Sequence, residues 1–111
     1  MLDHERLDVY RAALEFVDLS LRLIEVLPRG HSPLADQLRR SAMSVPLSIA
    51  EAAGKATPER GQFHRIARGS AMECGAIIDV IRLLHVADDR ELDRAKELLV
   101  RVVSMLTRMC R

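Results

Sequence analysis

Closely spaced arginines are the side chains of this sequence best suited to chemistry. Arg39 and Arg40 are adjacent, and Arg65 and Arg68 lie three residues apart. A planar guanidinium group donates two parallel hydrogen bonds to a phosphate, so grouped arginines favour phosphate contacts. Five side chains are therefore candidates for nucleic-acid binding: Arg39, Arg40, Lys55, Arg65 and Arg68. The alternative is ordinary solvated helix faces with ion pairs inside each helix.

The overall charge balance is compatible with both interpretations. The chain has 17 Lys and Arg residues and 16 Asp and Glu residues, so its formal net charge is +1. Nucleic-acid-binding domains are usually clearly basic, but a local basic stripe does not require a basic chain. Intrahelical pairs such as Glu97 with Arg101, four residues apart, would neutralise part of the charge.

No spacing in the sequence is typical of a metal site or a catalytic site. The four histidines never recur three or four residues apart, and no Glu-x-x-His motif occurs, so the di-metal site of some helical bundles is not expected. The serines lack a neighbouring base, and no P-loop or Gly-x-Ser-x-Gly motif is present. A triad assembled from distant residues would need architecture that short loops do not offer. We therefore expect no enzyme activity, cofactor, metal or small-molecule substrate.

Three breaks rich in proline, glycine or aspartate divide the chain into four helical segments. The breaks lie at residues 28–33, 54–58 and 85–89. Ser32 and Thr57 each precede a proline, the order expected for an N-cap followed by an N1 proline, and Asp88 or Asp89 offers the last cap. The expected helices are approximately residues 5–27, 33–54, 58–85 and 89–110 of a single domain, residues 1–111.

Composition and loop length indicate the fold class. Short connections make consecutive helices antiparallel neighbours, so we predict an all-α, up-down four-helix bundle. The apolar residues, 49% of the chain, are mostly Leu, Ala, Ile, Val and Met, and aromatics are only 3%. The N-terminus is too polar for a signal peptide and no apolar run could span a membrane, which favours a cytoplasmic protein. Cys74 and Cys110 belong to no Cys-x-x-Cys motif and are interpreted as reduced core or interface thiols.

Apolar residues recur at alternating spacings of three and four in every segment, which predicts the core-facing stripes. The stripes are Leu7, Tyr10, Leu14, Val17, Leu21, Ile24; Leu34, Leu38, Ala42, Val45, Ile49, Ala52; Phe63, Ile66, Ser70, Cys74, Ile77, Ile81, Leu84; and Leu92, Ala95, Leu99, Val102, Leu106, Met109. Further apolar residues lie beside them: Ala13, Phe16, Leu23, Leu27, Ile78, Leu83, Leu98, Val103 and Cys110. This second face predicts a subunit interface. The alternative is one broad core stripe.

Pro46 interrupts the second segment and should kink or split it, because proline removes an amide donor and displaces the carbonyl of Ala42. The hydroxyls of Ser41, Ser44 and Ser48 lie close enough in sequence to satisfy the freed backbone groups. The small residues Gly69-Ser70-Ala71 of the third segment are expected to receive this kink. In an antiparallel hairpin, residues whose numbers sum to about 112 lie level, which predicts an ion pair between Arg40 and Glu73.

Two segments of the sequence resemble a bacterial protein family. Residues 37–51 read QLRRSAMSVPLSIAE and resemble Q-L-R-R-x-x-x-S-[IV]-P-x-N-I-A-E; residues 63–73 read FHRIARGSAME and match F-x-x-x-A-R-G-S-x-x-E. The opening LDVYRAA of residues 7–13 looks like L-x-V-[WY]-x-x-A. The family comprises four-helix-bundle proteins encoded within intervening sequences of large-subunit ribosomal RNA genes. It includes the accessory variability determinant of diversity-generating retroelements.

The resemblance implies a four-helix subunit that assembles into a ring-like homopentamer. For the accessory determinant it also implies a basic surface that binds RNA or DNA and the retroelement's reverse transcriptase. Arg39, Arg40, Arg65 and Arg68 occupy the matching basic positions. The remaining motif residues are interpreted as structural: Pro46, Glu51, Gly69, Ser70 and Glu73.

The leading interpretation is a non-catalytic oligomeric adaptor that binds nucleic acid through phosphate contacts. The alternative is a homo-oligomeric scaffold for protein interactions, in which the basic residues serve assembly. Arg39, Arg65 and Arg68 distinguish the two. Binding is favoured if they gather on an outward face clear of acids, and scaffolding is favoured if each pairs with Glu51, Glu59 or Glu73.

Overall fold

The structure is a computed structural model that describes residues 2–110, with Glu5 and Arg6 described by their backbone alone. Within these residues the chain forms four α-helices and no strand: α1 (Asp8–Glu25), α2 (Ser32–Ala53), α3 (Glu59–Leu84) and α4 (Asp89–Met109). Two short 3-10 helices precede α1 and α2: η1 (Asp3–Arg6) and η2 (Arg29–His31). The predicted all-α class is confirmed, and the described helices are consistent with a four-helix bundle.

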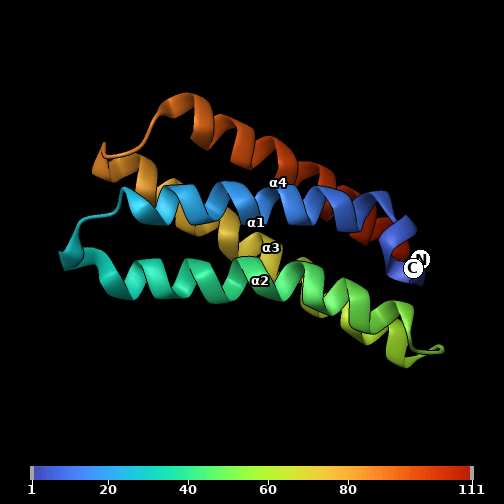
Figure 1. The fold of residues 1–111 in the computed structure, drawn as a ribbon. Coiled ribbons are helices and arrows are strands. Elements are labelled where there is room, and N and C mark those ends of the chain that lie inside the picture. Colours follow the sequence, from blue (N-terminus) through green and yellow to red (C-terminus); the bar gives the residue numbers. More distant parts are fainter. Residues whose placement is uncertain (1, 111) are drawn as a thin grey trace.

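The four helices lie alongside one another in a body that measures 43 × 26 × 24 Å (Figure 1). η1 lies at the end of the bundle where α4 finishes (Figure 1). Ion pairs cross between neighbouring helices at the rim. Arg94 of α4 reaches Glu15 of α1 at 2.7 Å, and Lys96 of α4 reaches Asp79 of α3 at 2.7 Å. Such exposed pairs contribute little each, so the buried apolar residues between the helices supply most of the stability.

The core-facing side of α1 differs from the prediction. Leu14 and Leu21 of the predicted stripe are 44% and 40% exposed, whereas Phe16 and Leu23, assigned to a second face, are completely buried. The buried residues of α1 are Val9, Ala12, Ala13, Phe16, Leu19, Ser20 and Leu23. α1 packs against both α2 and α4, so its buried face is wide, and small residues occupy part of it. Ile78 and Leu98, predicted for the same second face, are also core residues.

The stripes of α2 and α4 are confirmed along most of their length. Their buried members are Leu38, Ala42, Val45, Ile49 and Ala52 on α2, and Leu92, Ala95, Leu99, Val102 and Leu106 on α4. The second half of α3 also follows its predicted stripe, because Cys74, Ile77 and Ile81 are buried. In its first half the prediction is wrong at Ile66, which is exposed, because His64 faces the core there instead.

One of the three predicted helix caps is present. The Asp88 carboxylate accepts a hydrogen bond from the backbone N–H of Arg90 at 2.8 Å, and so satisfies a free donor at the start of α4. Ser32 is the first residue of α2 rather than its cap, and α3 starts at Glu59, after a cis Thr57–Pro58 bond. Neither of these two helices has a side-chain cap.

α2 continues through Pro46 as one helix. Pro46 is buried and has no N–H to donate to the Ala42 carbonyl. α2 changes direction along its second half (Figure 1). The Ser41 and Ser44 hydroxyls bond to α3, not to the backbone groups that the proline frees.

Gly69 does not receive the proline-containing part of α2. It is exposed, and a Cβ placed on it would meet no atom within 4 Å. The predicted close approach at Gly69 is therefore wrong. Ser70, the next residue, does contact α2, because one residue further along a helix turns the side chain by about 100°. The small residue at this interface is a serine that forms a hydrogen bond.

Candidate nucleic-acid interface

Two side-chain hydrogen bonds fix the position of α2 against α3. Ser70 donates to Ser44 at 2.8 Å, and Ser41 donates to a carboxylate oxygen of Glu73. In both bonds the numbers of the two residues sum to 114. The hairpin register expected from the sequence had a sum of about 112. The Glu73 carboxylate is therefore occupied by Ser41, and the predicted pair between Arg40 and Glu73 is wrong. Ser70 and Glu73, two of the motif residues interpreted as structural, hold the two helices in register.

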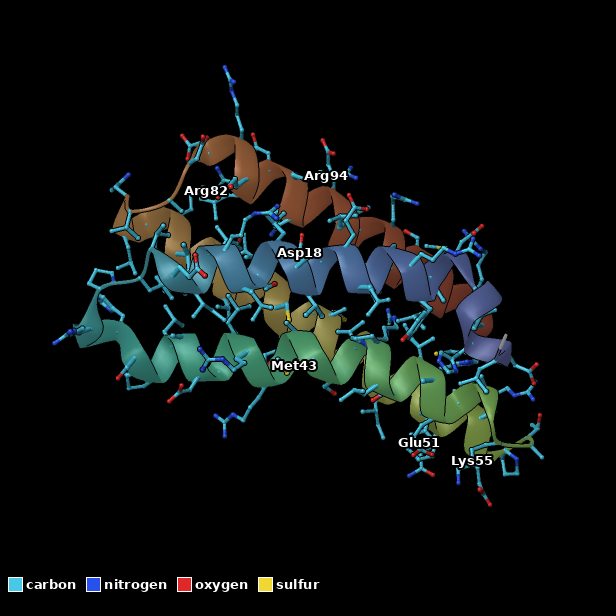
Figure 2. The ribbon with its side chains drawn as sticks, in the orientation of Figure 1. Asp18, Met43, Glu51, Lys55, Arg82 and Arg94 are labelled. Carbon is cyan, nitrogen blue, oxygen red and sulfur yellow. The ribbon has the colours of Figure 1, made fainter. Side chains whose placement is uncertain are left out.

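Arg40 and Lys55 line one groove beside α2. The groove has a volume of about 960 Å³ and is lined by residues that include His4, Arg40, Met43, Leu47, Glu51 and Lys55. Lys55 pairs with Glu51 at 3.6 Å, which neutralises its charge in part. Figure 2 shows Glu51 and Lys55 near the end of α2, with Met43 further back along the same helix. Arg40 is exposed and forms no ion pair within residues 2–110.

Arg39 lies beside a different recess of α2 and pairs with an acid there. Its guanidinium group pairs with Asp36, one helical turn away on α2, at 3.0 Å. Arg39 and Asp36 line a smaller recess of about 500 Å³ together with Pro33 and Arg40. Arg39 is thus a partly neutralised neighbour of the groove, as the solvated-face interpretation predicted for this residue.

Arg65 and Arg68 lie on α3, and Arg68 is on the side that approaches α4. Arg68 is half-buried and donates from Nε to the Thr107 hydroxyl of α4 at 2.9 Å, while Thr107 donates to the Val103 carbonyl at 2.7 Å. Arg65 is exposed and forms no ion pair within residues 2–110. The structure therefore separates the five candidates. Arg39 and Arg40 lie on α2 and Lys55 just after its end, whereas Arg65 and Arg68 lie on α3.

The arginines do not pair with the acids that would indicate scaffolding. Arg39 pairs with Asp36 rather than with Glu51, Glu59 or Glu73, and Arg65 and Arg68 pair with no acid in the described part of the chain. They do not form one cluster either. Arg65 and Arg68 meet part of the criterion set for nucleic-acid binding, because no carboxylate in the described part of the chain neutralises their charge.

His64, one turn from Arg68, is a buried titratable group that the sequence did not identify. It is 5% exposed, and its Nδ1 has no hydrogen-bond partner within residues 2–110. Burial lowers the pKa of the imidazole, the nearby Met109 backbone carbonyl opposes this shift, and the charge of Arg60 adds to it. A proton at Nδ1 would be a buried donor without an acceptor. His64 is therefore neutral in the folded protein near pH 7.

We expect the protein to lose stability between pH 7.5 and pH 5.5 because of His64. Its pKa is 6.5 when unfolded and lower when folded, so below pH 6.5 the unfolded chain binds more protons than the folded one. This contribution is present above pH 6.5 and is lost as the pH falls toward the folded pKa. Urea denaturation at both pH values measures it. In His64→Leu the difference between the two midpoints should shrink. An unchanged difference would mean that other groups cause the loss.

The described part of the chain contains no group of three or more His, Cys, Asp or Glu side chains arranged to hold a metal. None of its helices is long and apolar enough to cross a membrane. Cys74 lies in the core, where burial raises the pKa of its thiol to about 12, so it stays protonated at neutral pH. Cys110 is half-buried, and both cysteines are free.

Helical packing and a hydrogen-bonded α2–α3 interface define the described part of the chain as a small α-helical domain with exposed arginines that have no carboxylate partner there. The chain matches the family model of the 23S rRNA-intervening sequence protein over residues 5–108, and it belongs to that family. A search of the curated proteins finds no match. The family part of the resemblance seen in the sequence is thereby confirmed.

Proposed function

We propose that the protein is a non-catalytic adaptor that binds nucleic acid through phosphate contacts. Its membership in a family named for 23S rRNA intervening sequences fits a role associated with rRNA. The observation that carries the proposal is the state of Arg40 and Arg65. Both are exposed and without an ion pair within residues 2–110, although the chain has nearly as many acids as cations. Unpaired guanidinium groups bind phosphate without first losing an internal partner.

The proposed working form is a ring-like homopentamer of antiparallel up-down subunits, in the cytoplasm. Five copies would present the same cations five times, so that weak contacts in each subunit add through avidity. The resemblance to the accessory variability determinant suggests a reverse transcriptase as a protein partner. In this role the adaptor would hold the nucleic acid and the enzyme together and would have no reaction of its own.

A protein-interaction scaffold is the second candidate, and the α2 groove favours it. Leu47 is 66% exposed there, and Met43 and Arg40 lie beside it. Exposed apolar side chains next to methionine and arginine are common where proteins meet. In this case the arginines of α2 would serve assembly. Light scattering would show an oligomer, and fluorescence anisotropy would show no binding to nucleic acid.

We expect the protein to bind structured RNA and duplex DNA with micromolar or tighter affinity, and this affinity to fall steeply with salt. Each neutralised phosphate contributes about −0.9 to the slope of log affinity against log salt concentration. Arg40→Ala with Arg65→Ala should reduce that slope by about 2. Fluorescence anisotropy in a salt series measures the slope, and light scattering in the same buffer gives the oligomer mass.

Arg22→Ala with Arg94→Ala is the matched control. It removes the same charge from arginines that already have carboxylate partners, Asp18 and Glu15. We expect the control to change the slope much less. An oligomer that binds neither nucleic acid at low salt would rule out the proposed function and leave the scaffold.

A further inference from the structure

Half of α3 and half of α4 contain no acidic residue. Residues 60–72 of α3 and residues 98–110, the end of α4 and its C-cap, include no Asp or Glu. Together they carry five arginines, which we call the α3–α4 basic face: Arg60, Arg65, Arg68, Arg101 and Arg108. The net charge of +1 therefore conceals a strongly uneven distribution along the bundle.

These two acid-free segments lie against each other. Arg68 bonds to Thr107 at 2.9 Å, and His64 of the same α3 segment lies beside the Met109 backbone. Further along, Ala71 and Val103 line one recess between the two helices. The arginines of both helices thus belong to the same end of the bundle, where η1 and the end of α4 are seen in Figure 1.

None of the five arginines forms an ion pair within residues 2–110. Arg65, Arg101 and Arg108 are exposed. The predicted pair of Arg101 with Glu97 does not form, because the Glu97 carboxylate lies 3.4 Å from Arg94 instead. Acids do lie near the edge of the face, because Asp93 and Glu97 line a recess with Arg101. Asp8 of α1 lines a recess with Arg108, but the nearest cation to its carboxylate is Arg11, at 3.5 Å.

The rest of α3 and α4 shows the opposite balance. Residues 73–97 carry seven acids and four cations. Three of these cations are held by carboxylates: Arg82 by Asp89 and Asp93, Arg94 by Glu15 and Glu97, and Lys96 by Asp79. Figure 2 shows Arg82 and Arg94 on this part of the bundle. A polyanion would be repelled from this part and attracted to the basic face.

The chemistry of the face indicates which polyanion it fits. Single-stranded nucleic acid is held largely by stacking its bases on aromatic rings. The two acid-free segments contain one aromatic residue, Phe63, which is half-buried. Four of the arginines, all except Arg60, extend over about 14 Å of helix, from the level of Arg101 to that of Arg65. This length covers roughly four phosphates of one duplex strand at about 3.4 Å each.

We propose that the α3–α4 basic face, rather than the α2 groove, is the main surface that binds the sugar-phosphate backbone of double-stranded nucleic acid, without reading its sequence. This inference rests on the proposed function and names its surface and ligand. Arg65, Arg101 and Arg108 contact phosphates directly. Arg68 is held by Thr107 at the centre of the face and adds its charge from there.

Two triple variants test the inference. Arg65→Ala with Arg101→Ala and Arg108→Ala removes three charges from the face, and Arg39→Ala with Arg40→Ala and Lys55→Ala removes three from α2. Anisotropy is measured in a salt series on a labelled RNA duplex, the DNA duplex of the same sequence and its single strand. We expect the first variant to weaken duplex binding about tenfold or more and to lower the salt slope by about 3. The α2 variant should lower the salt slope by about 1 at most, because Arg39 and Lys55 already have carboxylate partners and only Arg40 is unpaired within residues 2–110.

Other outcomes separate the inference from the proposed function. Loss of binding in the α2 variant alone, or equal loss in both variants, would overturn the choice of surface and leave nucleic-acid binding intact. Tighter binding of the single strand than of either duplex would overturn the choice of ligand. Absence of binding to all three by the unmodified protein would overturn the proposed function as well. Circular dichroism of each variant confirms that it is folded.

Discussion

Replacing Leu23 by alanine is expected to lower the free energy of unfolding by about 2–5 kcal/mol. Leu23 is completely buried in the core, so the change removes apolar contacts and leaves a cavity. A loss of this size is a large part of the 5–15 kcal/mol that usually stabilises a small domain. Urea denaturation followed by circular dichroism measures it. The fitted slope with urea also shows whether the variant still unfolds as one unit.

Leu21→Ala is the matched control, because it makes the same chemical change two residues away. Leu21 is 40% exposed, and we expect its replacement to cost about 1 kcal/mol or less. The periodicity of the sequence predicts the reverse, since it places Leu21 in the core and Leu23 on a second face. A larger cost at Leu21 than at Leu23 would therefore contradict the packing of α1 in the structure.

The wrong prediction of the core-facing residues of α1 has a physical cause. The helix carries two apolar series with the same alternating spacing, one through Leu14 and Leu21 and one through Phe16 and Leu23. Periodicity identifies a helix but cannot rank two such series. The structure selects the series with Ala12, Ala13 and Ser20 beside it, because small side chains let α1 approach its neighbours. α2 was predictable because it offers one dominant series; on α4 the predicted series is buried together with Leu98 of the second face.

The sequence predicted which residues form the candidate site, but not which side chains surround them. Grouped arginines could be recognised from the chain, whereas their partners depend on the register between helices. A shift of two residues between α2 and α3 was enough to give Glu73 to Ser41 instead of Arg40. Arg68 meets Thr107, which lies 39 residues away. The acid-free halves of α3 and α4 are visible in the sequence, but their adjacency follows only from the packed structure.

Gly69 provides the sharpest difference between the sequence pattern and the structure. If Gly69 received the proline-containing part of α2, a methyl group there would force the helices apart. In the structure both Gly69 and Gly75 have free space around a Cβ, and neither has a positive φ. Both lie inside α3, where glycine is less favourable than alanine by about 1 kcal/mol because it loses more backbone freedom on folding.

Gly69→Ala with Gly75→Ala is therefore expected to raise the free energy of unfolding by roughly 1–2 kcal/mol, as two nearly independent gains. Gly54→Ala is the control, because Gly54 lies at the C-cap of α2 and gains little from helix propensity. Urea denaturation of the three proteins measures the differences. A loss of stability in the double variant, or a smaller mass by light scattering, would mean that another helix approaches this face closely. The small residues of α3 would then form a contact between subunits. The loss of that contact would outweigh the gain expected from helix propensity.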